Sequence, residues 1–294
     1  MPNAQSLMPT ILLSNDDGIA AAGLEVLEAI TQKLTKDYWV VAPEMEQSGA
    51  GHSLSLHAPV RVREISKKRY AVSGTPTDCV LLALKEIIPK ASLRGVTTTK
   101  QSRRSKLDRH ASLAMTVGID LVLSGVNRGS NVGDDVTYSG TVAAAMEATN
   151  LEVPAIALSQ LYDEKHEIYW ETAAHHAPAI IQKLVKHGWP KGVFINLNFP
   201  ACAPKKVKGV RLCPQGKRIV NVNLTGRLDP KGRPYYWLGG ERDNTADKPG
   251  VDIDLLHKGY ITITPISMDM TDYNVLQAMQ AAFVIPVKAG IQSF

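Results

Sequence analysis

The run Pro9-Thr-Ile-Leu-Leu-Ser14, followed at once by Asn15-Asp16-Asp17-Gly18, decides the fold of this chain. A short unbroken apolar run that ends at a polar turn is typical of a strand buried on both faces of a sheet. Residues 24–34 then repeat apolar side chains at helical spacing, and residues 38–42 form a second apolar run that stops at Pro43. Strand, helix and strand in this order predict a βαβ unit and therefore a parallel sheet.

The same alternation continues to about residue 200. After a predicted hairpin, formed by residues 60–65 and 69–72, Thr75-Pro76 begins a helix that runs to about Ile88. Proline fits a first helical turn, and a hydroxyl before it caps free N–H groups. The remaining elements are strands at 120–123, 154–158 and 193–197 and helices at 139–150 and 170–186. We predict an α/β fold with a Rossmann-like, doubly wound, mostly parallel sheet.

The composition changes beyond Pro200, where glycine, proline and charged residues become frequent. Arg233-Pro-Tyr-Tyr-Trp-Leu238 predicts one arm of an extended β-hairpin, and aromatic arms of this kind often pack on a partner subunit. Residues 261–266 predict a returning strand, and residues 271–282 predict a last helix. We therefore divide the chain into a core at 1–200, a C-terminal β-hairpin and oligomerisation region at 201–260, and a strand, helix and tail at 261–294.

The overall composition is that of an ordinary globular protein, with 44% hydrophobic and 21% charged residues. No apolar stretch approaches the roughly 18 residues of a membrane span, and residues 1–9 lack the basic start and apolar run of a secretory signal. Three widely spaced cysteines, Cys79, Cys202 and Cys213, indicate a reducing compartment without a disulfide framework or zinc knuckle. We expect a cytoplasmic protein with no membrane association.

The net charge of +5 is concentrated in one segment. Residues 91–111 contain six arginines or lysines and one aspartate, so the rest of the chain is close to neutral. A protein that binds nucleic acid usually spreads basic residues over a binding face. The distribution therefore argues against a nucleic-acid partner, although a contact through this one segment stays open as a minor alternative.

The adjacent carboxylates of Asp16 and Asp17 form the first of four polar clusters that lie at or just beyond predicted strand ends. Open α/β sheets place their ligands at this edge. Adjacent carboxylates repel each other unless a cation lies near them, and carboxylate oxygens suit Mg²⁺ or Mn²⁺. A turn in which one aspartate caps the following helix is the structural alternative.

The second cluster is the loop Gln47-Ser-Gly-Ala-Gly-His-Ser53 after the second strand. A loop of this composition can bring hydroxyls and amides close to a phosphate or a metal. His52 in the loop and His57 beyond it are candidate acids or bases. Flexible loops and single histidines of this kind more often have no catalytic role, so this cluster is unspecific by itself.

The third and fourth clusters lie at the next strand end and at the start of the alanine-rich helix. Residues 123–131 combine a glycine-rich turn with Asn127 and Asn131, whose oxygens can ligate a hard cation and whose amides can donate to phosphate. Tyr138-Ser-Gly-Thr-Val-Ala143 offers free N–H groups, two hydroxyls and a positive helix end, which suit a phosphoryl group. The structural alternatives are a turn in which asparagine and glycine adopt unusual backbone angles, and simple N-capping. Four such clusters at one sheet edge indicate phosphoryl-group chemistry.

These clusters resemble the motifs of the stationary-phase survival protein SurE family. The resemblance extends from Ile11 to about Met279, and its matching segments are Ser14–Gly18, Ser48–Ala50, Gly74–Cys79, Ser124–Asn127, Asn131–Glu147 and Lys258–Pro265. It implies a Rossmann-like fold and a metal-dependent 5′-nucleotidase. The implied reaction is hydrolysis of nucleoside 5′- and 3′-monophosphates to nucleoside and phosphate, with some activity on short-chain polyphosphate.

The resemblance also implies roles for individual residues. One divalent ion per subunit, Mg²⁺ or Mn²⁺, would have as its ligands Asp16, Asp17, Ser48 and Asn127. The substrate phosphate would be contacted by Asn131, Ser139, Gly140 and Thr141. Asp16 and Asp17 would be catalytic, with Asp16 preferred as nucleophile or base, and attack by water or by a carboxylate both stay open. The family implies a homodimer or homotetramer, formed through the hairpin and an exchanged C-terminal segment.

Two segments depart from the family pattern, an insertion at about 91–113 and a tail at 283–294, and neither contains a motif residue. Two rival functions agree less well with the sequence than the nucleotidase. An oxidoreductase with a dinucleotide cofactor needs a G-x-G-x-x-G turn after the first strand, where this chain has Asn-Asp-Asp-Gly. A non-enzymatic nucleic-acid-binding protein is disfavoured because the excess charge is confined to one segment.

Overall fold

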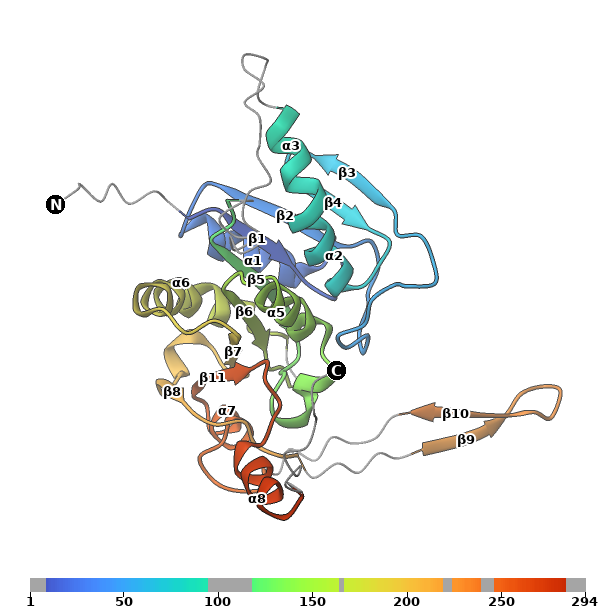
Figure 1. Ribbon diagram of the computed structural model, residues 1–294, viewed down its shortest axis with the longest axis vertical. Helices are drawn as coiled ribbons and strands as arrows, with labels where there is room; N and C mark the ends of the chain where they lie inside the picture. Colours follow the sequence, from blue (N-terminus) through green and yellow to red (C-terminus); the bar gives the residue numbers. More distant parts are fainter. Residues whose placement is uncertain (1–8, 95–117, 164–166, 219–223, 239–245, 284–294) are drawn as a thin grey trace, which may run out of the picture.

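The computed structural model describes residues 9–94, 118–163, 167–218, 224–238 and 246–283 (Figure 1). Most of the predicted insertion, and the predicted tail beyond Phe283, lie outside the described residues. The described residues form one large sheet with helices on both faces and a separate two-stranded hairpin that projects from the body (Figure 1). The predicted α/β fold with a hairpin appendage is confirmed.

The large sheet has nine strands in the order β3-β4-β2-β1-β5-β6-β7-β11-β8 among the described residues. The strands from β4 to β7 run parallel, and their bounds are Arg69–Val72 (β4), Tyr38–Pro43 (β2), Ile11–Ser14 (β1), Leu121–Arg128 (β5), Ala155–Gln160 (β6) and Val193–Phe199 (β7). The chain winds outward in one direction after β1 and in the other direction after β5. The direction of winding thus reverses between the paired strands β1 and β5. Open α/β sheets bind ligands beyond the carboxyl ends of the strands at such a switch point.

Antiparallel neighbours close the sheet at both sides. β3 (Val62–Ser66) pairs with β4 as the predicted hairpin, and β11 (Ile261–Ser267) pairs antiparallel with β7. The short β8 (Val210–Leu212) pairs parallel with β11. The segment beyond residue 200 thus returns to the main sheet, while β9 (Leu224–Leu228) and β10 (Pro234–Leu238) form the separate hairpin.

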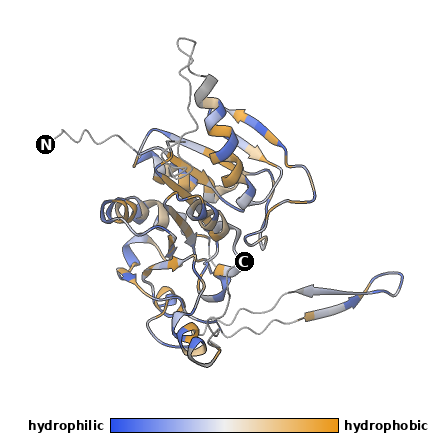
Figure 2. Cartoon of the chain, in the orientation of Figure 1, coloured by the Kyte–Doolittle hydropathy of each residue, from blue (hydrophilic) through white to orange (hydrophobic). Residues whose placement is uncertain are grey.

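Helices cover the two faces of the sheet and bury two hydrophobic cores. One core lies under α1 (Ala22–Gln32) and α6 (Trp170–His187), and the other lies under α2 (Pro76–Leu82) and α5 (Gly140–Asn150). Figure 2 shows the central strands as hydrophobic, with hydrophilic residues on the surrounding helices and loops. The first strand is buried at every position from Ile11 to Ser14, as its unbroken apolar run predicts.

The remaining elements are short. They are a π-helical turn (Ala83–Ile87), α3 (Ile88–Arg94), two 3₁₀ turns (Gly133–Thr137 and Pro204–Lys206), α7 (Asp252–His257) and α8 (Tyr273–Phe283). The helix that begins after Thr75 thus continues to Arg94, beyond the predicted end at Ile88. No helix among the described residues is long and apolar enough to cross a membrane.

One local prediction was wrong. Residues 124–128, predicted as a glycine-rich turn, belong to strand β5, whose pairing with β6 shifts register between Ser124 and Asn127. Gly125 has a φ of +132°, and a Cβ atom there would lie 2.2 Å from the carbonyl oxygen of Leu158. Glycine at this position allows two strands to approach closely instead of ending one of them.

Candidate active site

Asp16 lies directly beyond β1 and joins two other segments of the chain. Its side chain is 4% exposed, and its Oδ1 atom accepts a hydrogen bond from the Thr141 hydroxyl in the first turn of α5. Its main-chain carbonyl accepts the N–H of Gln47, at 2.8 Å, from the loop after β2. Three of the four predicted clusters therefore meet at this residue.

Asp17 joins the fourth cluster to the same place. Its Oδ2 atom accepts the main-chain N–H of Arg128 at the end of β5, at 3.3 Å, across the switch point. The preceding residue is Asn127, whose side-chain amide nitrogen donates to the carbonyl of Gly129 at 2.9 Å. Because the nitrogen is used in this way, the oxygen of that amide is the atom that Asn127 offers to a cation.

The two carboxyl groups are held in an environment that disfavours their negative charge. Burial raises the pKa of Asp16 to about 6, and the charge of Asp17 raises it too, against hydrogen bonds from Thr141 that lower it. Burial also raises the pKa of Asp17, and the charge of Glu46 adds to this effect. A cation beside both groups would remove this penalty, because an opposite charge favours the ionised form.

The neighbouring polar atoms fit a hard divalent cation. The Asn15 side-chain oxygen is buried and has no hydrogen-bond partner within the described part of the chain. The predicted ligand atoms are carboxylate, hydroxyl and amide oxygens, which suit Mg²⁺ or Mn²⁺. The described residues contain no cluster of three or more His, Cys, Asp or Glu side chains that could hold a metal, so acidic side chains alone do not make a complete ligand set here.

Ser48 is the predicted ligand that the structure connects least directly to the aspartates. Its side chain is exposed, and its hydroxyl donates to the Glu46 carboxylate at 2.7 Å. The loop that carries it is fixed by the Gln47 bond to Asp16 and by the Gly51 N–H, which donates to the Tyr138 carbonyl at 3.1 Å. The backbone therefore places Ser48 at the sheet edge, although its side chain points to another partner.

The start of α5 is packed against Asp16. Ser139 is the N-cap residue, and its hydroxyl accepts the N–H of Val142 at 3.1 Å. A Cβ atom on Gly140 would lie 2.7 Å from the Asp16 Cβ, so only glycine allows this approach. The hydroxyl and N–H of Thr141 are directed at Asp16. The N–H groups of Thr141 and Val142 are therefore already used by Asp16 and Ser139, while the positive end of the helix dipole still faces this edge of the sheet.

Asn131 lies in a buried polar network next to this edge. Its side-chain nitrogen donates to the Ser159 hydroxyl at 2.8 Å, and its main-chain N–H donates to the Asn198 side chain at 2.9 Å. Its carbonyl accepts bonds from the side-chain amides of Asn196 and Asn198. The Asn131 side chain is thus held by Ser159, and its backbone is held by Asn196 and Asn198.

The two histidines named from the sequence differ in their surroundings. His52 lies 3.0 Å from the carboxylate of Glu147, which is 9% exposed on α5. This contact adds a third anchor to the loop that carries Ser48. The side chain of His57 is exposed.

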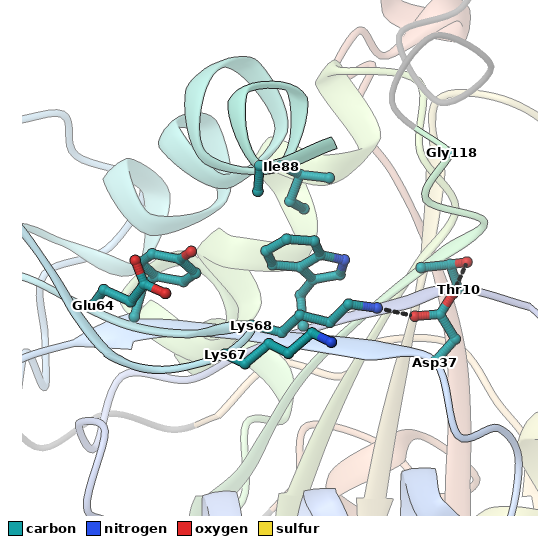
Figure 3. A pocket seen from close by; sticks show the side chains of 10 residues that line it. Thr10, Asp37, Glu64, Lys67, Lys68, Ile88 and Gly118 are labelled. Atoms are coloured by element: carbon teal, nitrogen blue, oxygen red, sulfur yellow. Dashed lines mark hydrogen bonds and ion pairs between the residues drawn. The ribbon is translucent and has the colours of Figure 1, made fainter. Parts of the chain in front are cut away.

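A separate hollow of about 440 Å³ lies at the opposite edge of the sheet, where the parallel strands begin. Its walls include the stacked rings of Trp39 and Tyr70, whose centroids are 6.2 Å apart. Figure 3 shows Lys68 directed at Asp37, which also accepts a bond from Thr10. None of the predicted site residues lines this hollow, so it lies apart from the candidate active site.

Two residues near the candidate site were not identified from the sequence. Glu46 contributes a third negative charge close to Asp17, and Arg128 contributes a positive charge that lowers the Asp17 pKa. The sequence does show Glu46 after the second strand and Arg128 next to Asn127, and both could have been named as candidates. Their proximity to Asp17 depends on strand order, which the sequence pattern alone does not give.

The fold and the site together define a class of protein. It is an α/β protein whose parallel sheet places paired carboxylates and a helix N-terminus at one switch point. The family model described as "Survival protein SurE" matches residues 11–100 and 106–222. The chain belongs to the SurE family. The short break in the match, at 101–105, falls inside the predicted insertion.

Related proteins match over most of their lengths. "5′-nucleotidase SurE" of Paramagnetospirillum magneticum is 46% identical over 273 residues, which cover 93% of this chain and 95% of the relative. "5′-nucleotidase SurE" of Brucella canis is 46% identical over 275 residues, with 92% and 97% covered. The crystal structure of the SurE protein from Aquifex aeolicus superposes with a TM-score of 0.72 and 34% identity, covering 93% of this chain and 99% of that one.

Proposed function

We propose that this protein is a metal-dependent 5′-nucleotidase, which hydrolyses nucleoside monophosphates to nucleoside and phosphate. The observation that carries the proposal is the contact between Asp16 and the first turn of α5, because it brings a carboxylate pair and an anion site together. Family membership and the names of the 46% identical relatives support the same reaction. The 3′-monophosphates and short-chain polyphosphate are further substrates in this proposal, since they present the same terminal phosphoryl group.

The ligands of one Mg²⁺ or Mn²⁺ ion in each subunit are, in this proposal, Asp16, Asp17, Ser48 and Asn127. When bound, the ion supplies a Lewis acid that stabilises negative charge on phosphoryl oxygens. Asp17 is oriented by the Arg128 N–H, and Asn127 is oriented by its bond to Gly129. These contacts hold the oxygens ready before the ion arrives, which lowers the entropic cost of binding.

The substrate phosphoryl group is bound, in this proposal, by Asn131 and by the start of α5 at Ser139, Gly140 and Thr141. The N–H groups of the helix start stabilise the charge that develops on the phosphoryl oxygens. Asp16 acts as nucleophile or as the base that accepts a proton from the attacking water. Its position between Thr141 and the loop after β2 fixes its orientation toward the bound group.

The assembly and location of the protein form a second part of the proposal. Residues 1–200 carry the chemistry, residues 201–260 carry the contacts between subunits, and residues 261–294 complete the sheet and the assembly. A homodimer or homotetramer is supported by the exposed aromatic side chains of Tyr236 and Trp237 on β10. A cytoplasmic location is supported by three free cysteines, two of them buried.

The experiment that tests this function is phosphate release from AMP and GMP, with EDTA and after addition of Mg²⁺ or Mn²⁺. We expect release that EDTA abolishes and that either ion restores. Asp16→Asn should remove at least about 99% of the activity, since it removes a ligand and a reacting group. Asp120→Asn, at the opposite edge of the sheet, makes the same charge change and should keep near wild-type turnover.

Two results would contradict the proposal. Turnover of Asp16→Asn close to the wild-type value at saturating metal would refute the role of this residue. No phosphate release from any nucleoside monophosphate, combined with salt-sensitive retention on DNA, would favour the nucleic-acid-binding alternative.

A further inference from the structure

The base of the β9–β10 hairpin is tied to the loop that leads into α5. Arg218 precedes the hairpin and pairs with Ala246, which follows it, as an isolated antiparallel bridge. Its side chain is 4% exposed. Its guanidinium Nη2 donates to the Asp135 carboxylate at 2.7 Å, and its main-chain N–H donates to the Asp134 carboxylate at 2.9 Å. An arginine at the hairpin base therefore holds two consecutive aspartates of the loop.

Asp135 connects this arginine to the candidate phosphate site. While its side chain binds Arg218, its main-chain carbonyl accepts the N–H groups of Tyr138 and Ser139, each at 3.0 Å. Ser139 is the N-cap of α5, and Gly140 follows it in contact with Asp16. A displacement of Asp135 would therefore move its carbonyl group, which is bonded directly to the N–H of the N-cap residue Ser139.

A second clamp fixes the other end of the same loop. The Gly133 N–H donates to the Asp252 carboxylate at 2.9 Å, and the Gly133 carbonyl accepts the side-chain amide of Gln215 at 2.7 Å. Asp252 also accepts the N–H of Gly216 at 2.8 Å. Gly133 has a φ of +56°, and a Cβ atom there would lie 2.7 Å from Ile253. Movement of the loop at this end would break its hydrogen bonds to Gln215, before the hairpin, and to Asp252, after it.

Burial makes the contact between Arg218 and Asp135 sensitive to change. The Asp135 side chain is 18% exposed, so solvent screens this pair less than it screens a surface pair. Removal of the arginine would take away the ion pair that this carboxylate now makes, and loss of one partner of a partly buried pair is destabilising. The Asp135 main chain is held as well, because its N–H donates to the Val132 carbonyl at 3.2 Å, so the arginine fixes the side chain of a residue whose backbone already borders α5.

We propose that Arg218 is a positioning residue for phosphate binding, which sets the start of α5 through Asp135 and couples it to the base of the hairpin. The inference rests on the proposed function only in that Ser139 and Gly140 bind a phosphoryl group. Arg218 contacts no reacting atom in this proposal. Its removal weakens phosphate affinity more than it slows the chemical step.

The test uses inorganic phosphate as the probe in isothermal titration calorimetry and AMP as the substrate in kinetics, with the full chain. We expect Arg218→Gln to raise both the phosphate Kd and the KM for AMP by about tenfold, because a displaced helix start would contact the phosphoryl group less closely. The kcat should change by less than about threefold. Arg218→Lys keeps the charge and should recover part of the affinity.

The hairpin provides a matched control. Arg233 pairs with Asp229 at 2.8 Å in the exposed turn of the hairpin, far along the chain from the loop at 133–139. Arg233→Gln removes the same kind of contact and should leave phosphate Kd, KM and kcat unchanged. An equal effect in both variants would overturn the proposal, because it would then reflect the hairpin in general.

A double variant separates coupling from simple loss of stability. Asp135→Asn keeps the carbonyl that binds Ser139 and removes the charge that binds Arg218. If the two residues act as a pair, Arg218→Gln combined with Asp135→Asn should weaken phosphate binding no more than the stronger single change. Additive losses would contradict the pairing. Asp135→Asn alone tests the same link if Arg218→Gln does not fold.

The outcomes also separate this inference from the proposed function. A wild-type protein that binds phosphate but does not hydrolyse AMP would refute the function and leave the inference testable by calorimetry. A wild-type protein that hydrolyses AMP, with unchanged phosphate affinity in folded Arg218→Gln, would overturn the inference alone. A wild-type protein that binds no phosphate would overturn the inference, and it would refute the function as well only if AMP were not hydrolysed.

Discussion

Gly140 and Asp16 are in such close contact that a Cβ atom on residue 140 would lie 2.7 Å from the Asp16 Cβ and 3.1 Å from Asp16 Oδ2. Pro76, at the start of α2, closes the same space, with its Cγ atom 3.1 Å from that position. The first turn of α5 can therefore reach the carboxylate only because residue 140 has no side chain.

Gly140→Ala should consequently reduce both activity and stability. Helix propensity alone would favour alanine by about 1 kcal/mol, but overpacking at a buried contact costs about 1–3 kcal/mol. We expect at least a tenfold loss of kcat/KM for AMP and a lower urea midpoint. Asn150→Ala, at the exposed last residue of the same helix, is the control and should change neither. Full activity in Gly140→Ala would show that the helix start and Asp16 do not act together.

Asp16 should make the stability of the metal-free protein depend on pH. Its pKa is about 6 in the folded protein and 3.8 as an ordinary group, so folding favours the protonated carboxyl. The folded state is therefore penalised above about pH 6, and the penalty disappears as the pH falls through 6 toward 4. Its full size is about 3 kcal/mol.

Urea unfolding in EDTA, from pH 4 to 8, measures this effect when wild-type protein is compared with Asp16→Asn. Other carboxyl groups titrate in both proteins, so only the difference in unfolding free energy reports Asp16. Wild-type stability should fall relative to the variant as the pH rises from 4 to 7. A difference that stays constant with pH would mean that Asp16 is ionised throughout this range.

Ser139→Ala should weaken substrate binding moderately. The variant loses the hydroxyl that accepts the Val142 N–H, which costs about 1 kcal/mol of helix stability. The N–H groups of the helix start remain, so we expect KM for AMP to rise about fivefold with the enzyme still active. Ser139→Thr retains a capping hydroxyl and should recover most of the loss. A complete loss of turnover in Ser139→Ala would indicate that the hydroxyl takes part in the reaction itself.

The aromatic side chains of the hairpin should stabilise the assembly. Tyr236 and Trp237 are 65% and 63% exposed on β10, and aromatic residues dominate the binding energy of many interfaces. Trp237→Ser should weaken self-association about tenfold or more, as measured by sedimentation velocity over a range of concentrations. Val185→Ser changes an exposed apolar residue on α6 and should leave the assembly intact. Equal behaviour of both variants would exclude the hairpin as an interface.

Much of the fold was predictable because its signals are local. The unbroken apolar run at 11–14 gives a buried strand, and the positions of Asp16 and Ser139 at element ends follow from the pattern of strands and helices. The rule that parallel strands place their ends at one edge then brings these residues together. Strand order was not needed for that step.

Other features depend on contacts between distant segments. The sequence places Thr141 among residues suited to phosphate, whereas the structure directs its hydroxyl at Asp16. Gly125 is equally consistent with a turn and with close strand approach, and only the neighbouring Leu158 carbonyl decides between them. The proximity of Arg128 to Asp17 likewise requires β1 and β5 to be adjacent. Patterns within one segment do not contain this information.

The position of β11 between β7 and β8 has a consequence for biosynthesis. A nascent chain that has left the ribosome only as far as Phe199 presents β7 as an open edge, with main-chain groups that another molecule can pair with. That edge is covered only when Ile261–Ser267 emerges, more than 60 residues later. Until then the incomplete sheet has an unpaired strand edge, which favours aggregation during translation.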